Sequence, residues 1–316
     1  MSSLRRFFDT FGYVVVRNVF DKSLIPGLID TYDEVVTKHF GMSKEEFYAQ
    51  PTPAPVISGV EKSQTLLSFL QDSRILPVVD ELIGDDAVYW GSELSTFKSP
   101  SQFHRNNLGD YRFLKVGVYL QDTTAEDGGQ FSCIPGSHIY GDTFSNFCST
   151  GLRWPKGAGY EEDTFRGEFD FNRPVEGNQI PAVNIDLAAG DIIFFDQRLV
   201  HRVPASNRLR RLISIVFFEG EKAFNARPRA NREFFGLTYS ETLVAMKIAL
   251  YLIDAYLSDR YGPLNYVENL HEFQIDKLRK YLITHTGEQF KDVKDNVLGN
   301  SYDVACRYVF KAPSPR

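Results

Sequence analysis

The segment from Val88 to Gly220 constrains the fold most, because it consists of short strand-like runs. These runs are apolar or alternate between apolar and polar residues, and Gly, Pro, Asn and Asp separate them; they are Val88–Phe97, Phe113–Gln121, Gln130–Ile134, Ile192–Phe195 and Leu212–Phe218. Short strands with turn residues between them are typical of an antiparallel sandwich or a jelly roll. The sequence therefore predicts a β core in the middle of the chain.

Helical patterns flank this β core on its N-terminal side. A β-branched run at Tyr13–Val16 predicts a strand, and a helical pattern opens at Asp21. Three prolines between Pro51 and Pro55 favour an extended loop, and the next apolar pattern predicts one helix over Gln64–Ile83.

The chain after residue 230 is helical in pattern again, with Tyr239–Arg260 and Val267–Thr284 as the main segments. We expect a jelly-roll domain at residues 1–230 and a helical C-terminal extension at 231–316 that packs on it. Residues 143–183 are polar, rich in Gly, Asp and aromatics, and aperiodic, which predicts an insertion or lid. The fold class is thus mixed α+β. The C-terminal helices either cap the core or form a homodimer, and the pattern does not choose between them.

Composition narrows the class of partner. The chain has 316 residues, 43% of them hydrophobic, and a formal net charge of −6 without a long basic run, so we expect a small-molecule substrate and neither nucleic acid nor a membrane. The most apolar stretch, Leu243–Leu257, contains Lys247 and Asp254 and is shorter than the roughly 20 residues of a membrane helix. Three widely spaced cysteines and no signal peptide predict a cytoplasmic protein.

Histidine and a neighbouring amide are the candidate metal ligands. A mononuclear iron oxygenase site uses two imidazoles and one carboxylate on one face of the metal. His104 and Asn106, two residues apart, together with His201 provide most of such a set. Residues two apart share one side of a strand, so the first two side chains would point the same way.

Four ordered segments carry a family resemblance. They are Phe11–Phe20, Phe103–Asn106 with Leu114–Asp122, Gly128–His138, and Ala189–Asp196 with His201. In order and spacing they resemble the phytanoyl-CoA dioxygenase family of iron(II)- and 2-oxoglutarate-dependent oxygenases, over roughly residues 5 to 220. The resemblance implies a double-stranded β-helix (jelly-roll, cupin-like) core, with Fe(II), 2-oxoglutarate and O2 as cofactor and co-substrates.

Carried onto this chain, the family pattern places His104 and His201 at the two histidine ligand positions. Asn106 falls where the family has aspartate. A neutral amide changes the formal charge of the site with Fe(II) and 2-oxoglutarate from −1 to 0 and should weaken metal binding. Three interpretations stay open: the amide ligates and the enzyme works, the protein is an impaired pseudo-oxygenase, or the residue was substituted to trap a complex. Asp110 is a weaker candidate for a replacement carboxylate, and halogenation is disfavoured because asparagine fills the position that a halide would need.

The family also supplies an arginine for the far carboxylate of 2-oxoglutarate. The pattern Arg-x-x-Ile-Ser selects Arg210, with Arg211 as the alternative, and the two point to opposite faces of a strand. We expect whichever arginine is not the anchor to face solvent. Ser214 shares the face of Arg210 and is a further candidate for co-substrate contact. Lys115 and Tyr119 share a face of another predicted strand and are candidates too.

The leading hypothesis is therefore a dioxygenase that oxidises a C–H bond of a small molecule, most simply by hydroxylation, in secondary or specialised metabolism. The alternatives are a non-catalytic jelly-roll protein that has lost competent iron, favoured by Asn106, and a metal-dependent lyase or isomerase on a cupin-like barrel, which would not need Arg210. The expected His138 role is structural.

Overall fold

A computed structural model describes residues 2–50, 53–97, 101, 103–106, 112–124, 128–139, 152–153, 169–170, 182–204, 206, 208–226 and 239. The helices are α1 (Ser3–Phe11), α2 (Ile25–Phe40), α3 (Lys44–Ala49), α4 (Gln64–Leu67), α5 (Leu76–Ile83) and α7 (Glu221–Ala226), with 3-10 turns η1 (Lys22–Leu24), η2 (Val60–Lys62) and η3 (Ser68–Gln71). The strands are β1 (Tyr13–Val16), β2 (Val56–Ile57), β3 (Val88–Phe97), β4 (Phe113–Tyr119), β5 (Phe131–Cys133), β6 (Leu152–Arg153), β7 (Phe169–Asp170), β8 (Val183–Ile185), β9 (Ile192–Asp196), β10 (His201–Arg202) and β11 (Arg210–Phe218).

The largest sheet is antiparallel and has the strand order β1-β9-β4-β11-β3-β2. Its register brings Ser214 of β11 opposite Gly117 of β4 and Glu93 of β3. Because side chains alternate along each strand, directly opposite residues share a face. Every second residue of β11 from Arg210 onward therefore belongs to one face, which we call the inner face.

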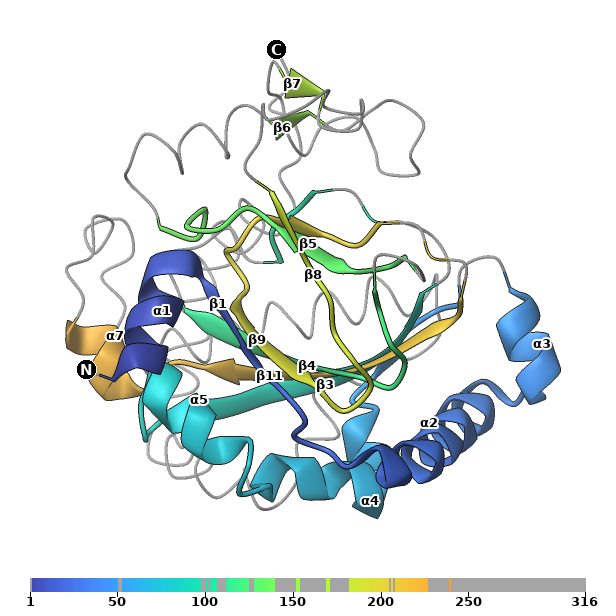
Figure 1. The fold of residues 1–316 in the computed structure, drawn as a ribbon. Coiled ribbons are helices and arrows are strands. Elements are labelled where there is room, and N and C mark those ends of the chain that lie inside the picture. The colour runs from blue at the N-terminus through green and yellow to red at the C-terminus, as the bar shows by residue number, and fades with distance from the viewer. Residues whose placement is uncertain are drawn as a thin grey trace, which may run out of the picture.

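Helices cover the other face of this sheet. Figure 1 shows α2, α4 and α5 lying along one side of the strands. Ile213 and Val116 project from the sheet into a buried cluster that includes Tyr32, Leu66 and Leu82 of these helices. Complete burial of one such aliphatic side chain contributes about 1.5–3 kcal/mol, so this layer supplies much of the stability of the fold.

A second antiparallel sheet, of order β10-β5-β8, packs against the inner face. Tyr119, Phe195 and Leu212 of the large sheet form one buried cluster with Phe131 and Ile185 of the small sheet. The architecture is thus a mixed α/β protein with two facing antiparallel sheets and helices on the outer face of one of them. His201 begins β10 of the small sheet, and its ring lies against Phe195 of the large sheet.

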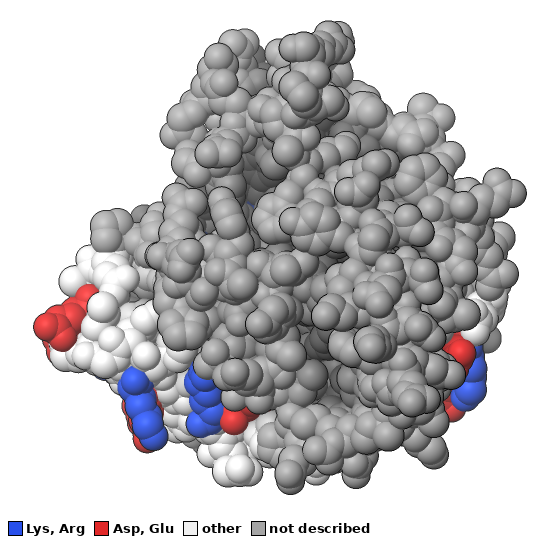
Figure 2. Space-filling view, turned by 180° about the vertical axis from the view of Figure 1, so that it is seen from behind, with Lys and Arg blue, Asp and Glu red and all other residues white. Residues whose placement is uncertain are grey.

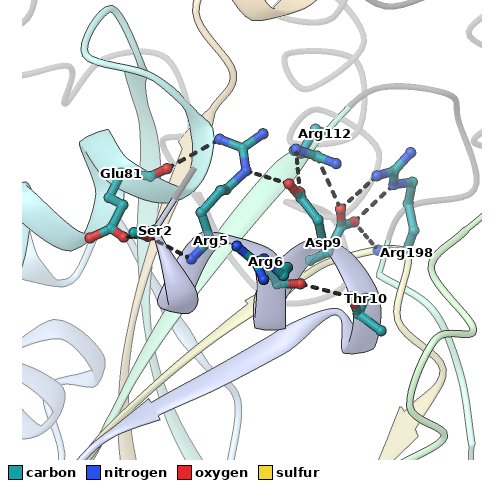
Figure 3. Close-up of polar contacts among 9 residues, drawn as sticks. Ser2, Arg5, Arg6, Asp9, Thr10, Glu81, Arg112 and Arg198 are labelled. Atoms are coloured by element: carbon teal, nitrogen blue, oxygen red, sulfur yellow. Dashed lines mark hydrogen bonds and ion pairs between the residues drawn. The ribbon is translucent and has the colours of Figure 1, made fainter.

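Helix α1 is an element that the sequence analysis did not predict. Ser2 caps its start, Gly12 ends it in the left-handed conformation, and Phe8 is its one buried residue. Arg5 Nε pairs with Asp9 within the helix at 2.6 Å, and Arg112, which lies outside the helix, is 3.2 Å from the same carboxylate and ties the helix to the rest of the protein (Figure 3).

The same chain of charges continues to the end of β9. Arg112 Nε is 3.6 Å from Asp196, and Arg198 is 2.6 Å from the same carboxylate, which is completely buried. Burial opposes ionisation of Asp196, but the charge and hydrogen bonds of Arg198 lower its pKa to about 2. The charged network therefore ties α1 to the segment that leads into His201.

The predicted single helix at Gln64–Ile83 is wrong, because the segment breaks into α4, η3 and α5. Asp72 accepts a hydrogen bond from the backbone of Arg74, and a proline occupies the first turn of α5, where it cannot continue a preceding helix. The expected insertion at 143–183 and the C-terminal helices lie almost wholly outside the described residues.

Surface features of the described residues are unexceptional. None of the helices among them has the length and apolar character needed to cross a membrane. In Figure 2 most of the visible Lys and Arg side chains lie beside Asp or Glu, whereas one acidic patch at the left stands apart.

Candidate metal centre

An isolated antiparallel bridge joins His104 to His201. The backbone N–H of each donates to the carbonyl of the other, at 2.9 and 3.0 Å, and the two imidazole centroids are 4.4 Å apart. This bridge brings together the two histidines that the sequence pattern paired from a distance.

The surroundings of His201 leave one ring nitrogen available as a ligand. Its side chain is buried, and Nδ1 lies 2.8 Å from the carbonyl oxygen of Leu199. A carbonyl only accepts, so Nδ1 carries the hydrogen and the lone pair resides on Nε2. Burial, reinforced by the neighbouring His104, lowers the pKa of His201 well below its usual range, which keeps the ring neutral. The ring of Phe131 stacks on it with centroids 5.2 Å apart, and the ring of Phe195 lies tilted against it at 4.9 Å.

Asn106 is exposed and is held beside the same segment through its backbone. Its N–H donates to the carbonyl of Gln197 at 2.9 Å. The expected regular strand is absent here, since the structure has only a bridge at His104 and a bend at Asn106. Cross-chain hydrogen bonds to the 197–201 segment, rather than strand alternation, fix this stretch.

The third ligand position has no carboxylate within the described part of the chain. There, no group of three His, Cys, Asp or Glu side chains is placed to hold a metal ion. Asp110, the weaker replacement candidate, lies outside the described residues. The described donors are therefore two imidazoles, with the amide of Asn106 two residues after His104.

Arg210 lies on the inner face and is almost completely buried, at 1% exposure. Its Nη1 donates to the carbonyl of Gly129 at 3.2 Å, and its guanidinium lies 5.7 Å from the ring centre of Phe97. Gly129 has a φ of +74°, and a Cβ there would come within 2.5 Å of Arg210 Cδ. Glycine is therefore required for both the turn and the space that the arginine occupies.

Tyr119 shares the inner face with Arg210. Burial raises the pKa of Tyr119 to about 12, although the charge of Arg210 opposes the rise. The phenol thus stays protonated at neutral pH. Burial also lowers the pKa of Arg210, yet an arginine remains charged at any physiological pH.

Arg211 points to the helix-covered face, as the alternation predicted, but it does not face solvent. Its Nε is 2.6 Å from Asp33 of α2, its Nη2 is 3.0 Å from the same carboxylate, and Tyr48 is a further partner. The expectation of a solvent-facing charge was wrong because α2 brings a carboxylate over this strand. The ion pair occupies Arg211 on the face opposite the histidines.

The remaining candidates also lie on the inner face. Ser214 is completely buried, and Lys115 Nζ is 3.6 Å from Glu93 Oε2. Sequence reasoning did not single out Glu93 or Gly129. The alternation of β3 would have placed Glu93 on the inner face, whereas nothing local in the sequence links Gly129 to Arg210.

These residues fit an iron ion and 2-oxoglutarate. Two adjacent imidazoles, at least one of them neutral with a free Nε2, suit a divalent first-row metal, and a buried arginine suits a carboxylate. The model of the phytanoyl-CoA dioxygenase family matches residues 8–212. The chain belongs to this family. It is therefore an oxygenase that depends on iron, 2-oxoglutarate and O2.

Solved structures agree at the level of the fold. The carbocyclase SnoK of nogalamycin biosynthesis, described as non-heme and α-ketoglutarate dependent, aligns with a TM-score of 0.50 and 18% identity, over 69% of this chain and 84% of SnoK. HygX from Streptomyces hygroscopicus, with nickel and 2-oxoglutarate bound, aligns with a TM-score of 0.51 and 16% identity, over 69% of this chain and 87% of HygX. No curated protein matches the chain.

Proposed function

We propose that this protein oxidises a C–H bond of a small molecule, with hydroxylation as the simplest outcome, in secondary or specialised metabolism. The observation that carries the proposal is the bridged pair of His104 and His201, with the buried Arg210 on the inner face of the adjoining sheet. The two facing antiparallel sheets support a double-stranded β-helix for the oxygenase domain, which we assign to residues 1–230. Residues 231–316 are proposed to pack on that domain as a helical extension.

Each group has a distinct role in this proposal. His104 and His201 bind iron through ring nitrogens, and the amide oxygen of Asn106 takes the third protein position. When bound, iron with 2-oxoglutarate and O2 supplies the oxidising power for substrate oxidation, with succinate and CO2 as by-products. Arg210 orients 2-oxoglutarate by binding its distal carboxylate, while the buried Tyr119 beside it stays neutral and leaves that positive charge intact.

Leu199 has a supporting role, because its carbonyl fixes the hydrogen on Nδ1 of His201. The ring then presents Nε2 in one orientation. The aromatic side chains of Phe131 and Phe195 limit water around this imidazole. Such fixed orientation and desolvation strengthen metal binding by a neutral imidazole.

A binding protein without turnover is the second candidate, and Asn106 is the observation that favours it. A neutral amide is a weaker donor than a carboxylate toward a hard cation. In that case the pocket binds ligand, but 2-oxoglutarate is not consumed.

Decarboxylation of 2-oxoglutarate in air with added Fe(II) tests the proposal. We expect succinate from the unmodified protein, and Arg210→Met should raise the KM for 2-oxoglutarate about 100-fold through loss of a charge-assisted pair. Arg208→Met, at an exposed arginine two residues away, is the matched control and should leave the KM unchanged. Succinate at the level of the protein-free blank refutes the enzyme; thermal stabilisation by 2-oxoglutarate without succinate identifies the binding protein.

A further inference from the structure

A second polar group of side chains lies on the inner face, away from Arg210. Glu93 of β3 and Lys115 of β4 flank the central strand β11, and Ser214 of β11 lies directly opposite Glu93. Their heads meet across β11, with Lys115 Nζ 3.6 Å from Glu93 Oε2. We call these three residues the Glu93–Lys115 cluster.

The cluster is separated from the arginine end of the site. Ser214 follows Arg210 by four residues, a span of about 13 Å along an extended strand. Leu212 occupies the inner face between them. A single carboxylate of 2-oxoglutarate cannot contact both side chains across this span. The spacing therefore assigns Ser214 to a different part of the inner face from Arg210.

The cluster is close to the histidines. Lys115 pairs across the sheet with Phe195 of β9, and the ring of Phe195 is 4.9 Å from that of His201. The positive charge of Lys115 also contributes to the lowered pKa of His201, after burial and His104. A molecule bound at the cluster would thus lie beside the metal ligands.

The cluster has hydrogen-bonding capacity to spare. Glu93 Oε1 accepts a hydrogen bond from the hydroxyl of Ser95. Glu93 Oε2 is 3.6 Å from Lys115 Nζ, beyond the roughly 2.7–3.2 Å of an N–H···O hydrogen bond, so the two charged groups form an ion pair without a direct hydrogen bond. The Glu93 side chain is 31% exposed. Ser214 Oγ is buried and has no hydrogen-bond partner in the described part of the chain, an arrangement that costs about 1–3 kcal/mol unless a ligand satisfies it.

A glycine leaves room beside the cluster. Gly91 lies opposite Val216 on the inner face, next to the position of Lys115, and a Cβ there would meet no atom of the described residues within 4 Å. This face thus combines open space, two charged groups that do not hydrogen-bond to each other and a hydroxyl without a described partner, which are the features of a polar subsite.

Resting on the proposed function, we propose that the Glu93–Lys115 cluster binds the substrate and that the bound group is an uncharged hydroxyl, as in a glycoside or a cyclitol. A hydroxyl donates to Glu93 and accepts from Lys115 at the same time. A carboxylate or phosphate would be attracted by Lys115 but repelled by Glu93, whereas an ammonium group would be attracted by Glu93 but repelled by Lys115. The cluster therefore favours neutral hydroxyl groups over charged groups, and an unsubstituted acyl chain, as in octanoyl-CoA, offers it no hydroxyl.

The test uses the protein loaded anaerobically with Fe(II) and 2-oxoglutarate, and the probes are methyl glucosides, myo-inositol and octanoyl-CoA. We expect at least one neutral polyol to shift the visible band of the chelate and to accelerate succinate formation in air, whereas octanoyl-CoA does neither. Glu93→Gln and Lys115→Met should each raise the half-saturating polyol concentration about tenfold. The affinity for 2-oxoglutarate should stay unchanged.

Lys222→Met is the matched control, because Lys222 forms a surface ion pair with Asp85 in which both side chains are 73% exposed. It should leave the polyol response intact. Two results would overturn the subsite without affecting the oxygenase proposal. One is an intact chelate band that responds to no polyol, and the other is a polyol response in the Glu93 and Lys115 variants equal to that of the unmodified protein. Absence of the chelate band in the unmodified protein is a failure of the proposed function instead.

Discussion

Protonation of His138 is predicted to destabilise the fold in mild acid. The side chain is 1% exposed, in the turn after β5, with its ring centre 6.5 Å from that of Phe8 on α1. Burial is the main cause that lowers its pKa from 6.5 to about 4; the nearby Asp196 opposes the shift, and Arg198 adds to it. His138 is therefore neutral in the folded protein at pH 7.

The sign and size follow from proton linkage. Below pH 6.5 the unfolded chain binds a proton at His138, but the folded protein does so only near pH 4. The stability gained by keeping the ring neutral is complete above pH 6.5 and is lost as the pH falls toward 4. Each tenfold difference in proton affinity between the folded and unfolded chain corresponds to about 1.4 kcal/mol, so the loss at pH 4 is about 3 kcal/mol.

Urea unfolding at about pH 7.5 and about pH 4 measures this loss. Between these two pH values, the unfolding free energy of the unmodified protein should fall by about 3 kcal/mol more than that of His138→Leu. His39→Leu is the control: His39 is only partly buried, its pKa is also lowered by burial, and its effect should be smaller. The reasoning is refuted if the unmodified protein and His138→Leu lose the same free energy.

Three further substitutions test other contacts. Arg211→Met leaves the buried Asp33 without its main partner and should lower the unfolding free energy by about 3 kcal/mol in urea, with 2-oxoglutarate affinity unchanged. Gly129→Ala should push Arg210 aside and weaken 2-oxoglutarate binding at least about tenfold, as measured by titration of the chelate band. Arg112→Met removes the link between Asp9 and Asp196 and should lower the unfolding free energy by about 1 kcal/mol in the same urea assay; an unchanged value would mean that the network contributes nothing to stability.

The strands of the β core could be predicted because their signal is local. Val88–Phe97 is a strand over its whole predicted length, and Tyr13–Val16 and Ile192–Asp196 agree closely with the apolar runs. Alternating or continuous apolar residues reflect burial on one or both faces, which each strand carries in its own sequence.

Helix α1 was missed although its own sequence carries a helical signal. It buries only Phe8, and its position depends on ion pairs with Arg112, which in turn contacts Asp196. Leu4, Phe7, Phe8 and Phe11 nevertheless recur at helical spacing between the Ser2 cap and Gly12, and this local pattern could have predicted the helix. The break near Asp72 was missed for a different reason, since the apolar pattern continues across it while side-chain capping ends the turn.

For the candidate site, the sequence predicted on which face of a strand a side chain lies better than it predicted which residues that side chain contacts. The opposite orientations of Arg210 and Arg211 followed from strand alternation, and the structure agrees. That Arg211 meets Asp33, or that Lys115 meets Glu93, depends on how strands and helices are arranged across the whole sheet. The pairing of His104 with His201 rested on family resemblance rather than on any local signal.

The central claim is that His104, His201 and the position of Asn106 hold iron together with 2-oxoglutarate. Anaerobic addition of Fe(II) and 2-oxoglutarate tests it most directly, by the weak visible charge-transfer band of the chelate, in the unmodified protein and in Asn106→Asp. We predict the band in both proteins, with saturation at lower Fe(II) in Asn106→Asp because a carboxylate restores one negative charge. A band in Asn106→Asp alone would make asparagine a disabling residue. Its absence from both proteins would contradict the claim.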